Sequence, residues 1–494
     1  MTNEYLYGTY GIIGETVAQN AVQAGTVLAY IGTAPVNLVR GYKDLKIVNY
    51  PVKLSNIGEA ERKLGYSSDW ESFTLCEVFT AHFDNAIGNI GPVYVVNILD
   101  PDTHKTDAIT KTLKFTGGRA EFKGNKIILD SIVLEDLVEG VDYSIEYNFA
   151  KEKTSIKSLD PDNPISGDVL MTYNEVDSGS IEYEDIIGRV TEEGDYSGIG
   201  VIQLFYQEQN IVPNIIAAPG WSGIPAVYNA MISASKKING QWDAFVNADI
   251  PLTSENTRVD TISKAKEWKN NNGYTSERSK AYWPKGVDNF GRNYHLSTLA
   301  SVEMLRTDLK HNSVPMETPG NKQIPIARQY FGPESKNNGF DKQTAKELTS
   351  NGITTTVASE GAWVLWGDHT AAYTFGGDVD PRAIFDLSIR MLLHISNSFQ
   401  REWGAVIDKP MDRQLVDTIL NREQEKLDTL ASMGALLGKP SALFLESENS
   451  TTDLMNGNFR WDIPVTPTPP FKSGTVYVAY TDAGFKYFFE GGAA

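Results

Sequence analysis

The sequence predicts a multidomain fold that combines α/β and α+β architecture within 494 residues. In residues 25–102 and 197–377, short apolar runs alternate with helical patterns, which is typical of a doubly wound, mostly parallel sheet. Between residues 103 and 196 the helical periodicity disappears and short β-prone stretches recur. We therefore expect an α/β core with an inserted all-β domain, followed by a C-terminal α+β domain, with extended arms at the two ends of the chain.

These changes of pattern also set the expected domain limits. The limits are 1–24 for an N-terminal arm, 25–102 and 197–377 for the two parts of the α/β core, 103–196 for an inserted β-sandwich or barrel, 378–472 for the C-terminal domain, and 473–494 for a C-terminal strand or arm. An inserted domain that has its own core can project from an α/β unit without disturbing it.

The α/β core is predicted from alternating strands and helices. Residues 27–31 and 93–99 are short apolar runs, which indicates buried strands. Between residues 70 and 87, apolar side chains recur at helical spacing, and Ser68 or Asp69 can cap this helix. The second part continues the alternation, with strands at 214–220, 244–248 and 281–283 and helices at 224–237 and 258–269.

The inserted region contains four β-prone stretches separated by turn residues. They are residues 113–115, 126–129, 143–147 and 169–173. Strands at such spacing favour a small β-sandwich or barrel.

The C-terminal part changes from helical to extended. Apolar residues at helical spacing predict helices over residues 382–400 and 415–433. The proline-rich segment 464–470 should be stiff and extended. Beyond it, residues 475–480 alternate as a strand and residues 486–489 form a second aromatic stretch. Such a tail either pairs with a partner outside its own domain or folds back on its own sheet.

The N-terminal arm has the same character as this tail, because strand-forming residues are interrupted there by glycines. A short strand with glycines has little to bury alone and is a weak edge in isolation. We therefore predict that both arms supply strands to other subunits. The candidate residues are Tyr5, Tyr7, Tyr10, Ile12, Val476, Tyr477, Val478 and Tyr480.

The composition excludes several classes of function. A hydrophobic content of 41% and a charged content of 22% are ordinary for a soluble globular protein. The net charge of −19 argues against nucleic-acid binding and against anionic membranes. No apolar run reaches the roughly 18 residues of a membrane span, and the N-terminus lacks a signal-peptide pattern, so we expect a cytoplasmic product. The single Cys76 excludes an internal disulfide and a multi-cysteine metal site.

The search for chemistry finds no cofactor motif: no phosphate-binding loop, no dinucleotide fingerprint and no zinc-binding H-E-x-x-H. Ser222 lies near a helix start and is interpreted as a cap rather than a nucleophile. His369 could orient a catalytic group, and His82 is interpreted as a packing residue. The turn 160–163 could bind calcium weakly, but a turn needs no ion. We predict no catalytic, cofactor-binding or metal-binding residue.

Several segments, taken in order, resemble the contractile phage tail sheath family. Residues 214–220 resemble the strand and turn of the family's subtilisin-like domain. Residues 348–353 followed by 361–370 resemble its asparagine-glycine-isoleucine, tryptophan-glycine and threonine signature. The helix that follows Asp380-Pro381-Arg382 resembles the start of the family's C-terminal domain, and residues 434–436 and the strand 475–480 fit as well. The inserted residues 103–196 carry no such signal.

This resemblance implies a structural role. The subtilisin-like name refers to topology rather than to protease activity, and the expected contexts of a protease are missing, since no His-Gly pair occurs in the chain. The resemblance implies subunits that stack as six-membered rings in a helical assembly around a tail tube. Terminal arms add strands to neighbouring subunits and keep the lattice connected while it contracts and drives the tube through the host envelope.

The resemblance also implies partners and a location. The partners are other copies of the chain, the tail tube protein, and the baseplate and tail terminator proteins. The location is a virion tail or tail-like particle that is assembled in the cytoplasm of a bacterial host. Two other function classes stay open from the sequence: a hydrolase on a doubly wound α/β fold, and a surface protein whose β insertion binds a ligand.

Overall fold

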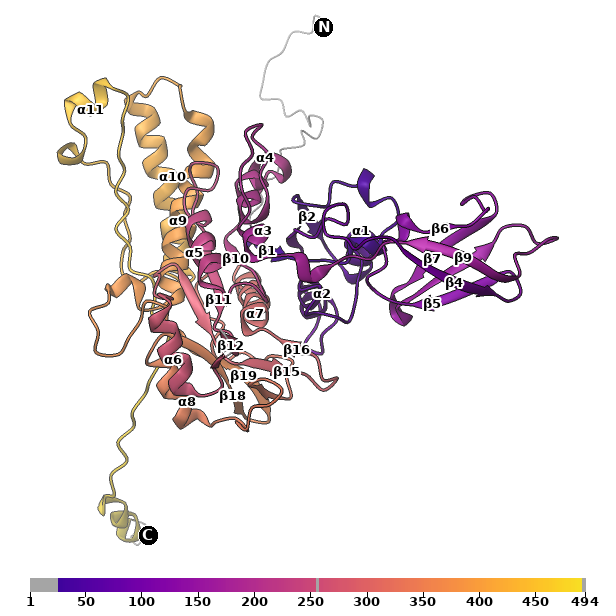
Figure 1. Cartoon of the computed structure of the whole chain (residues 1–494). Helices are drawn as coiled ribbons and strands as arrows, with labels where there is room; N and C mark the ends of the chain where they lie inside the picture. The colour runs from indigo at the N-terminus through magenta and orange to yellow at the C-terminus, as the bar shows by residue number, and fades with distance from the viewer. Residues whose placement is uncertain (1–24, 255–256, 491–494) are drawn as a thin grey trace, which may run out of the picture. The chain divides into compact units, whose positions relative to one another are not determined.

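The computed structural model describes residues 25–254 and 257–490 (Figure 1). The chain divides into two compact units, residues 1–419 and residues 420–494, which are described separately. Within the described residues, no helix is long and apolar enough to cross a membrane.

An eight-stranded sheet forms the centre of the first unit, in the strand order β19-β18-β14-β11-β10-β1-β3-β2. The strands are β1 Leu28–Gly32, β2 Pro51–Leu54, β3 Val93–Asn97, β10 Ile215–Ala217, β11 Phe245–Asp249, β14 Ser279–Tyr282, β18 Ile353–Ser359 and β19 Ala362–Trp366. All neighbouring pairs are parallel except the two at the edges, β2 with β3 and β18 with β19. The predicted parallel sheet is therefore confirmed.

Helices cover both faces of this sheet, so its central strands are buried along their whole length. Alternate side chains of β11 point to opposite faces. Asn247 donates a hydrogen bond to Ser301 of helix α7 (Leu296–Lys310) at 2.7 Å, whereas Ala248 packs with Tyr228 of helix α5 (Pro225–Ala234). The other helices of the core are α1 Ile57–Leu64, α2 Leu75–Phe83, α3 Tyr183–Ile187, α4 Phe205–Gln209, α6 Ile262–Asn271 and α8 Lys342–Thr349. The remaining short strands are β12 Thr253–Ser254, β13 Thr257–Arg258, β15 Lys285–Val287, β16 Asn293–Tyr294 and β17 Arg328–Tyr330.

The strand order changes direction at β1. The next parallel strand in the chain, β3, is added on one side of β1, and β10, β11, β14 and β18 are added in sequence on the other side. In open α/β sheets, ligands bind beyond the carboxyl ends of the strands at such a reversal. The carboxyl ends of β1 and β10 are therefore the place to look for a site.

The inserted region is a β-sandwich of two three-stranded antiparallel sheets (Figure 1). One sheet has the order β4-β9-β6 and the other β5-β8-β7, with bounds β4 Ile109–Phe115, β5 Arg119–Lys123, β6 Val133–Leu134, β7 Tyr143–Asn148, β8 Lys153–Ser158 and β9 Gly167–Tyr173. The predicted strand at 126–129 is wrong. Backbone carbonyls of Asn125 and Ile127 accept hydrogen bonds from the Asn37 side chain of the core, and the chain then enters a single helical turn at Leu129–Ser131.

The packed part of the insertion ends before residue 196. Val176, Ile181 and Ile186 belong to the hydrophobic core of the large sheet, not to that of the sandwich. In the other direction, Leu38 of the α/β core is buried among the apolar side chains of the sandwich. A five-residue helix such as α3 is too short to show a helical period in the sequence, which explains the wider limit expected from the pattern.

Helix limits differ from the predicted ones where a cap or turn intervenes. Helix α2 begins at Leu75 rather than near residue 70, because Asp69 accepts a hydrogen bond from the backbone N–H of Ser72 and holds a turn there. Helix α6 begins after Thr261, whose hydroxyl accepts from the backbone N–H of Lys264. Helix α9 spans Asp386–Trp403 and follows a single turn that Asp380 caps.

The second unit contains the end of helix α10 (Arg413–Ser432), the short helix α11 (Thr451–Met455) and two chain segments that run antiparallel to each other. Two isolated antiparallel bridges join these segments, Leu436 with Pro467 and Leu443 with Asp462. Backbone hydrogen bonds from Leu437 to Thr466 (2.8 Å) and from Thr468 to Ala435 (3.0 Å) hold the first of them.

The predicted C-terminal strand at residues 475–480 is not formed in the described part of the chain. Residues 471–480 lie in neither a helix nor a strand, so folding back on the chain's own sheet does not occur in the described residues. The aromatic stretch at 486–489 is helical, with a turn at Ala483–Lys486 followed by α12 at Tyr487–Glu490. An isolated strand has no backbone partner, so its formation depends on a second strand.

Candidate functional site

Ser222 follows the carboxyl end of β10, where a nucleophile would lie in an α/β hydrolase. Its hydroxyl donates to Oδ2 of Asp249 at 3.3 Å and accepts from the backbone N–H of Asp249 at 3.0 Å. The side chain is completely buried, and no hydrogen bond joins it to a histidine. The predicted helix cap is therefore wrong, because Ile224 occupies the capping position of α5 and Ser222 instead binds a strand that lies 27 residues later.

Asp249 is the centre of this buried polar cluster. Its carboxylate also accepts from the backbone N–H of Ser297 at 3.0 Å and from the Ser297 hydroxyl at the start of α7. Burial raises the pKa of the Asp249 carboxyl, while the nearby His295 and the Ser297 hydrogen bonds oppose that rise. The cluster joins β10, β11 and α7, so its geometry serves packing.

His295 lies close to Gly220 at the carboxyl end of β10, and Glu77 accepts two hydrogen bonds from it. Its Nδ1–H donates to Oε2 of Glu77 at 2.7 Å, and its backbone N–H donates to Oε1 of Glu77 at 2.7 Å. The Glu77 carboxylate is almost fully buried in helix α2. This pair therefore fastens α2 to the first turn of α7 rather than orienting a base toward Ser222.

The reversal point of the sheet is filled by side chains. Thr74 lies so close to the ends of β1 and β10 that a Cβ on Gly32 would meet its hydroxyl at 2.3 Å and a Cβ on Gly220 its methyl at 2.8 Å. Both glycines are required by this approach. The crevice in which α/β sheets of this kind bind ligands is thus closed in this chain.

His369 lies near the amino ends of the strands, whereas Ser222 lies beyond their carboxyl ends. The backbone N–H of Ala371, two residues after His369, donates to the carbonyl of Ser279, which is the first residue of β14. The imidazole stacks on Tyr373 with ring centroids 3.5 Å apart, and its Nδ1–H donates to the carbonyl of Ile384 at 2.9 Å. It is buried as a packing residue and is not combined with Ser222.

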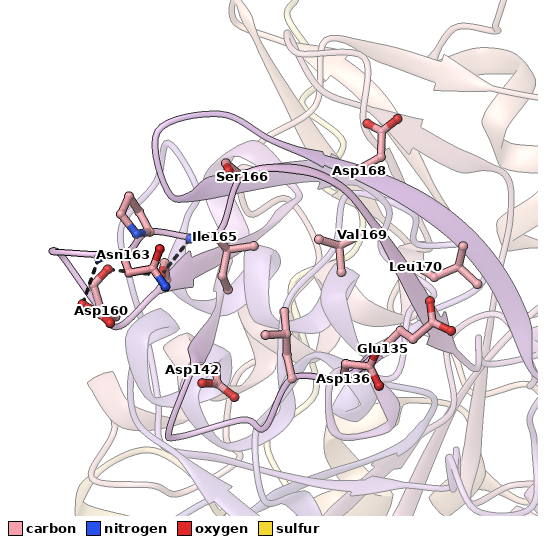
Figure 2. Close-up of a pocket in the computed structure, with 13 residues that line it drawn as sticks. Glu135, Asp136, Asp142, Asp160, Asn163, Ile165, Ser166, Asp168, Val169 and Leu170 are labelled. Atoms are coloured by element: carbon pink, nitrogen blue, oxygen red, sulfur yellow. Dashed lines mark hydrogen bonds between the residues drawn. The ribbon is translucent and has the colours of Figure 1, made fainter.

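A hollow of about 500 Å³ lies on the β insertion. Five carboxylates line it without any lysine or arginine: Glu135, Asp136, Asp142, Asp160 and Asp168. Figure 2 shows these side chains spread along the hollow rather than converging on one point. Asp160 accepts from the backbone N–H groups of Asp162 and Asn163 and so holds its own turn. In the described ranges, no three acidic, histidine or cysteine side chains are placed to hold a metal ion.

The C-terminal segment exposes a run of apolar residues. Phe471 is 91% exposed, and the strand candidates Val476, Tyr477, Val478 and Tyr480 are 81%, 91%, 89% and 85% exposed. Folded chains rarely leave so many large apolar side chains together in water unless another surface covers them. The N-terminal candidates Tyr5, Tyr7, Tyr10 and Ile12 lie outside the described residues.

Comparison with known proteins decides the family. No protein-family model matches the chain. The tail sheath protein of Burkholderia phage BcepMu is 24% identical over 504 aligned residues, which cover 96% of each protein. A subunit in the baseplate structure of the anti-feeding prophage covers 97% of this chain and 99% of its own at 12% identity, with a TM-score of 0.52. The chain belongs to the contractile tail sheath family.

A second solved structure supports the same fold for this sheath protein. The sheath complex of an extracellular contractile injection system in its contracted state covers 97% of this chain and 100% of its own at 10% identity, with a TM-score of 0.53. The sheath protein is thus a structural component of a contractile tail or tail-like particle, and its named relatives are structural proteins rather than enzymes. The buried, separate positions of Ser222 and His369 agree with that role.

Proposed function

We propose that this sheath protein polymerises as stacked six-membered rings around a tail tube and contracts to drive the tube through the host envelope. The observation that carries the proposal is the exposed apolar segment 471–480, which has strand-forming residues and no partner strand in the described part of the chain. An extended segment of this kind adds to the edge of another sheet, where backbone hydrogen bonds supply the affinity.

The two antiparallel segments of the second unit are a suitable acceptor for such a strand. They are joined by isolated bridges, and a pair of extended segments is at best marginally stable in water without a third strand or a covering helix. A strand of about six residues adds several backbone hydrogen bonds, each worth roughly 0.5–1.5 kcal/mol net. Two arms per subunit would therefore contribute several kcal/mol per junction, enough to keep neighbours connected while larger surfaces slide.

The finer features of the fold and its partners belong to the same proposal. We infer that the α/β core has subtilisin-like topology without protease activity. We also infer that the domain limits expected from the sequence apply, except that residues 176–187 pack with the α/β core rather than with the insertion. The partners are further copies of the chain, the tube protein, and the baseplate and terminator proteins. Assembly takes place in the cytoplasm of a bacterial host. The six-fold symmetry named for one similar structure and the contracted state named for the other support the proposed rings and their contraction.

Proline substitutions in the C-terminal segment test the strand exchange, because proline removes one backbone donor from a ladder. Adjacent residues of a strand direct their N–H groups to opposite sides, so Val478→Pro and Tyr477→Pro remove a donor from opposite edges of an added strand. If the strand is outermost in the acceptor sheet, one of the two variants stops tube formation and the other does not. If it lies between two strands, both stop it.

The matched control is Ser473→Pro, which adds the same residue before the strand segment. All three variants should keep the parental circular dichroism and thermal unfolding, because the altered residues are exposed. Negative-stain microscopy should show tubes for the parent and for Ser473→Pro. Normal tubes from both Tyr477→Pro and Val478→Pro would show that this segment does not connect subunits.

A further inference from the structure

The first side-chain contacts of the described residues lie at the point where the N-terminal arm joins the core. The Thr26 hydroxyl donates to Oδ2 of Asp308 at 2.6 Å. The next residue, Val27, donates its backbone N–H to the Asn214 side chain at 2.8 Å, and its carbonyl accepts from the backbone of Asn214 at 2.9 Å. The chain is thus held from Thr26 onward, immediately before β1.

The acceptor at this point is a buried charge that serves two elements. Asp308 lies in the last turn of α7 and is completely buried. The same Oδ2 also accepts from the guanidinium of Arg390 in helix α9, and this arginine is 4% exposed. One carboxylate oxygen therefore holds both the start of the chain's core and the first long helix of the C-terminal region.

A second buried ion pair fixes α9 one turn earlier. Asp386 pairs with Lys280 of β14, and both side chains are fully buried. Asp386 and Arg390 are four residues apart and so lie on one face of α9, where each meets a core residue of opposite charge. The four charges balance, so each buried charge has a partner of opposite sign. The two pairs join helix α9 to β14 and to α7.

We propose that Asp308 is a positioning residue for strand exchange: it anchors the root of the N-terminal arm, through Thr26, to the α9 network. This inference rests on the proposed function of the arms. A hydrogen bond to a buried carboxylate is stronger than one between neutral groups, so it fixes where the arm leaves the core. Loads that a neighbouring subunit places on the arm then pass to α7 and α9 as well as to β1, which lies between β10 and β3.

The anchor also affects assembly before any contraction. An arm whose starting point is fixed presents its strand near the neighbour's edge at a higher effective concentration than one with a loosened root. Thr26→Val removes only the hydroxyl and keeps the shape of the side chain. We expect it to raise the monomer concentration needed for tube formation about three- to tenfold. Thr26→Ser keeps the hydroxyl and should assemble like the parent.

Thr318→Val is the matched control. The Thr318 hydroxyl donates to Asp386 at 3.2 Å, so this variant loses a similar bond to the other buried carboxylate, away from the arm. It should form tubes at the parental concentration. The measurement is the critical concentration by sedimentation, with tubes counted by negative-stain microscopy and thermal unfolding followed by circular dichroism to confirm that all variants are folded.

Deletion of residues 1–20 separates this inference from the function on which it rests. If the deletion abolishes tubes and Thr26→Val raises the critical concentration while Thr26→Ser and Thr318→Val do not, the anchor is supported. If the deletion abolishes tubes but Thr26→Val assembles normally, the anchor is wrong and the arms still connect subunits. If the deleted chain forms normal tubes, the proposed exchange by this arm is itself wrong. Equal losses in Thr26→Val and Thr318→Val would assign the effect to general loosening and overturn the anchor.

Discussion

The pH dependence of stability can be worked out from His82, a histidine that is completely buried in helix α2. Its Nδ1–H donates to the carbonyl of Ile90 at 3.0 Å, and its Nε2 accepts from the Tyr30 hydroxyl at 2.8 Å. A carbonyl can only accept, so Nδ1 carries the proton, and Nε2 is the acceptor in the neutral ring. Burial lowers the pKa of His82 from 6.5 to about 4.

The sign follows from proton binding in the two states. Below pH 6.5 the unfolded chain binds a proton at this ring and the folded chain does not, until the pH approaches about 4. The free energy of unfolding therefore falls as the pH drops through this window. The loss from this group is about 2 kcal/mol between about pH 7 and about pH 5, and about 3 kcal/mol when both states are protonated.

His82→Phe tests this value because it removes the titrating ring nitrogens and keeps a ring in the cavity. The variant should be less stable at neutral pH by roughly 1–3 kcal/mol, since it leaves the Ile90 carbonyl and the Tyr30 hydroxyl without their partner. Its loss of stability between about pH 7 and about pH 5 should, however, be smaller than the parental loss by about 2 kcal/mol. Other titrating groups are common to both proteins and cancel in this difference.

Tyr30→Phe is the control, because it loses the same hydrogen bond and keeps the titrating ring. It should retain the parental dependence on pH. Urea unfolding followed by tryptophan fluorescence suits the measurement, since Trp461 is the only tryptophan beyond residue 419 and the signal therefore reports on the first unit. Equal pH dependence in His82→Phe and the parent would refute a neutral His82 in the folded chain.

Three further outcomes are expected. Arg390→Met should destabilise the protein by about 3–5 kcal/mol in urea unfolding, because Asp308 is then a buried charge without its partner, and adding Asp308→Asn should recover part of that loss. Ser222→Ala should form normal tubes in the microscope with a stability loss of about 1–2 kcal/mol, whereas a hydrolase activity that this change abolishes would contradict the structural role. Replacing residues 107–173 by a Gly/Ser linker should leave folded, polymerising protein only when Leu38→Ser is added, because Leu38 otherwise loses its apolar cover.

The sequence by itself determined the architecture wherever a pattern is local. The apolar runs at 27–31 and 93–99 predicted central strands, because a strand covered on both faces needs apolar residues throughout its length. The loss of helical periodicity after residue 103 predicted the β insertion, because this change of pattern is also local in the sequence. The family resemblance also came from short segments, and the end-to-end relative with 24% identity agrees with it.

Only the tertiary structure decided the roles that depend on partners far away in the chain. Ser222 was interpreted as a helix cap until the structure placed Asp249 beside it. No sequence pattern distinguished the buried pairs Lys280–Asp386 and Arg390–Asp308. Thr26 and Asp308 are 282 residues apart, a separation that no local pattern can encode. Residues 475–480 carry a strand pattern and yet form no strand in the single chain. The physical reason is that a side chain's pattern states what it prefers to contact, whereas the fold determines which donor, charge or strand edge lies within reach.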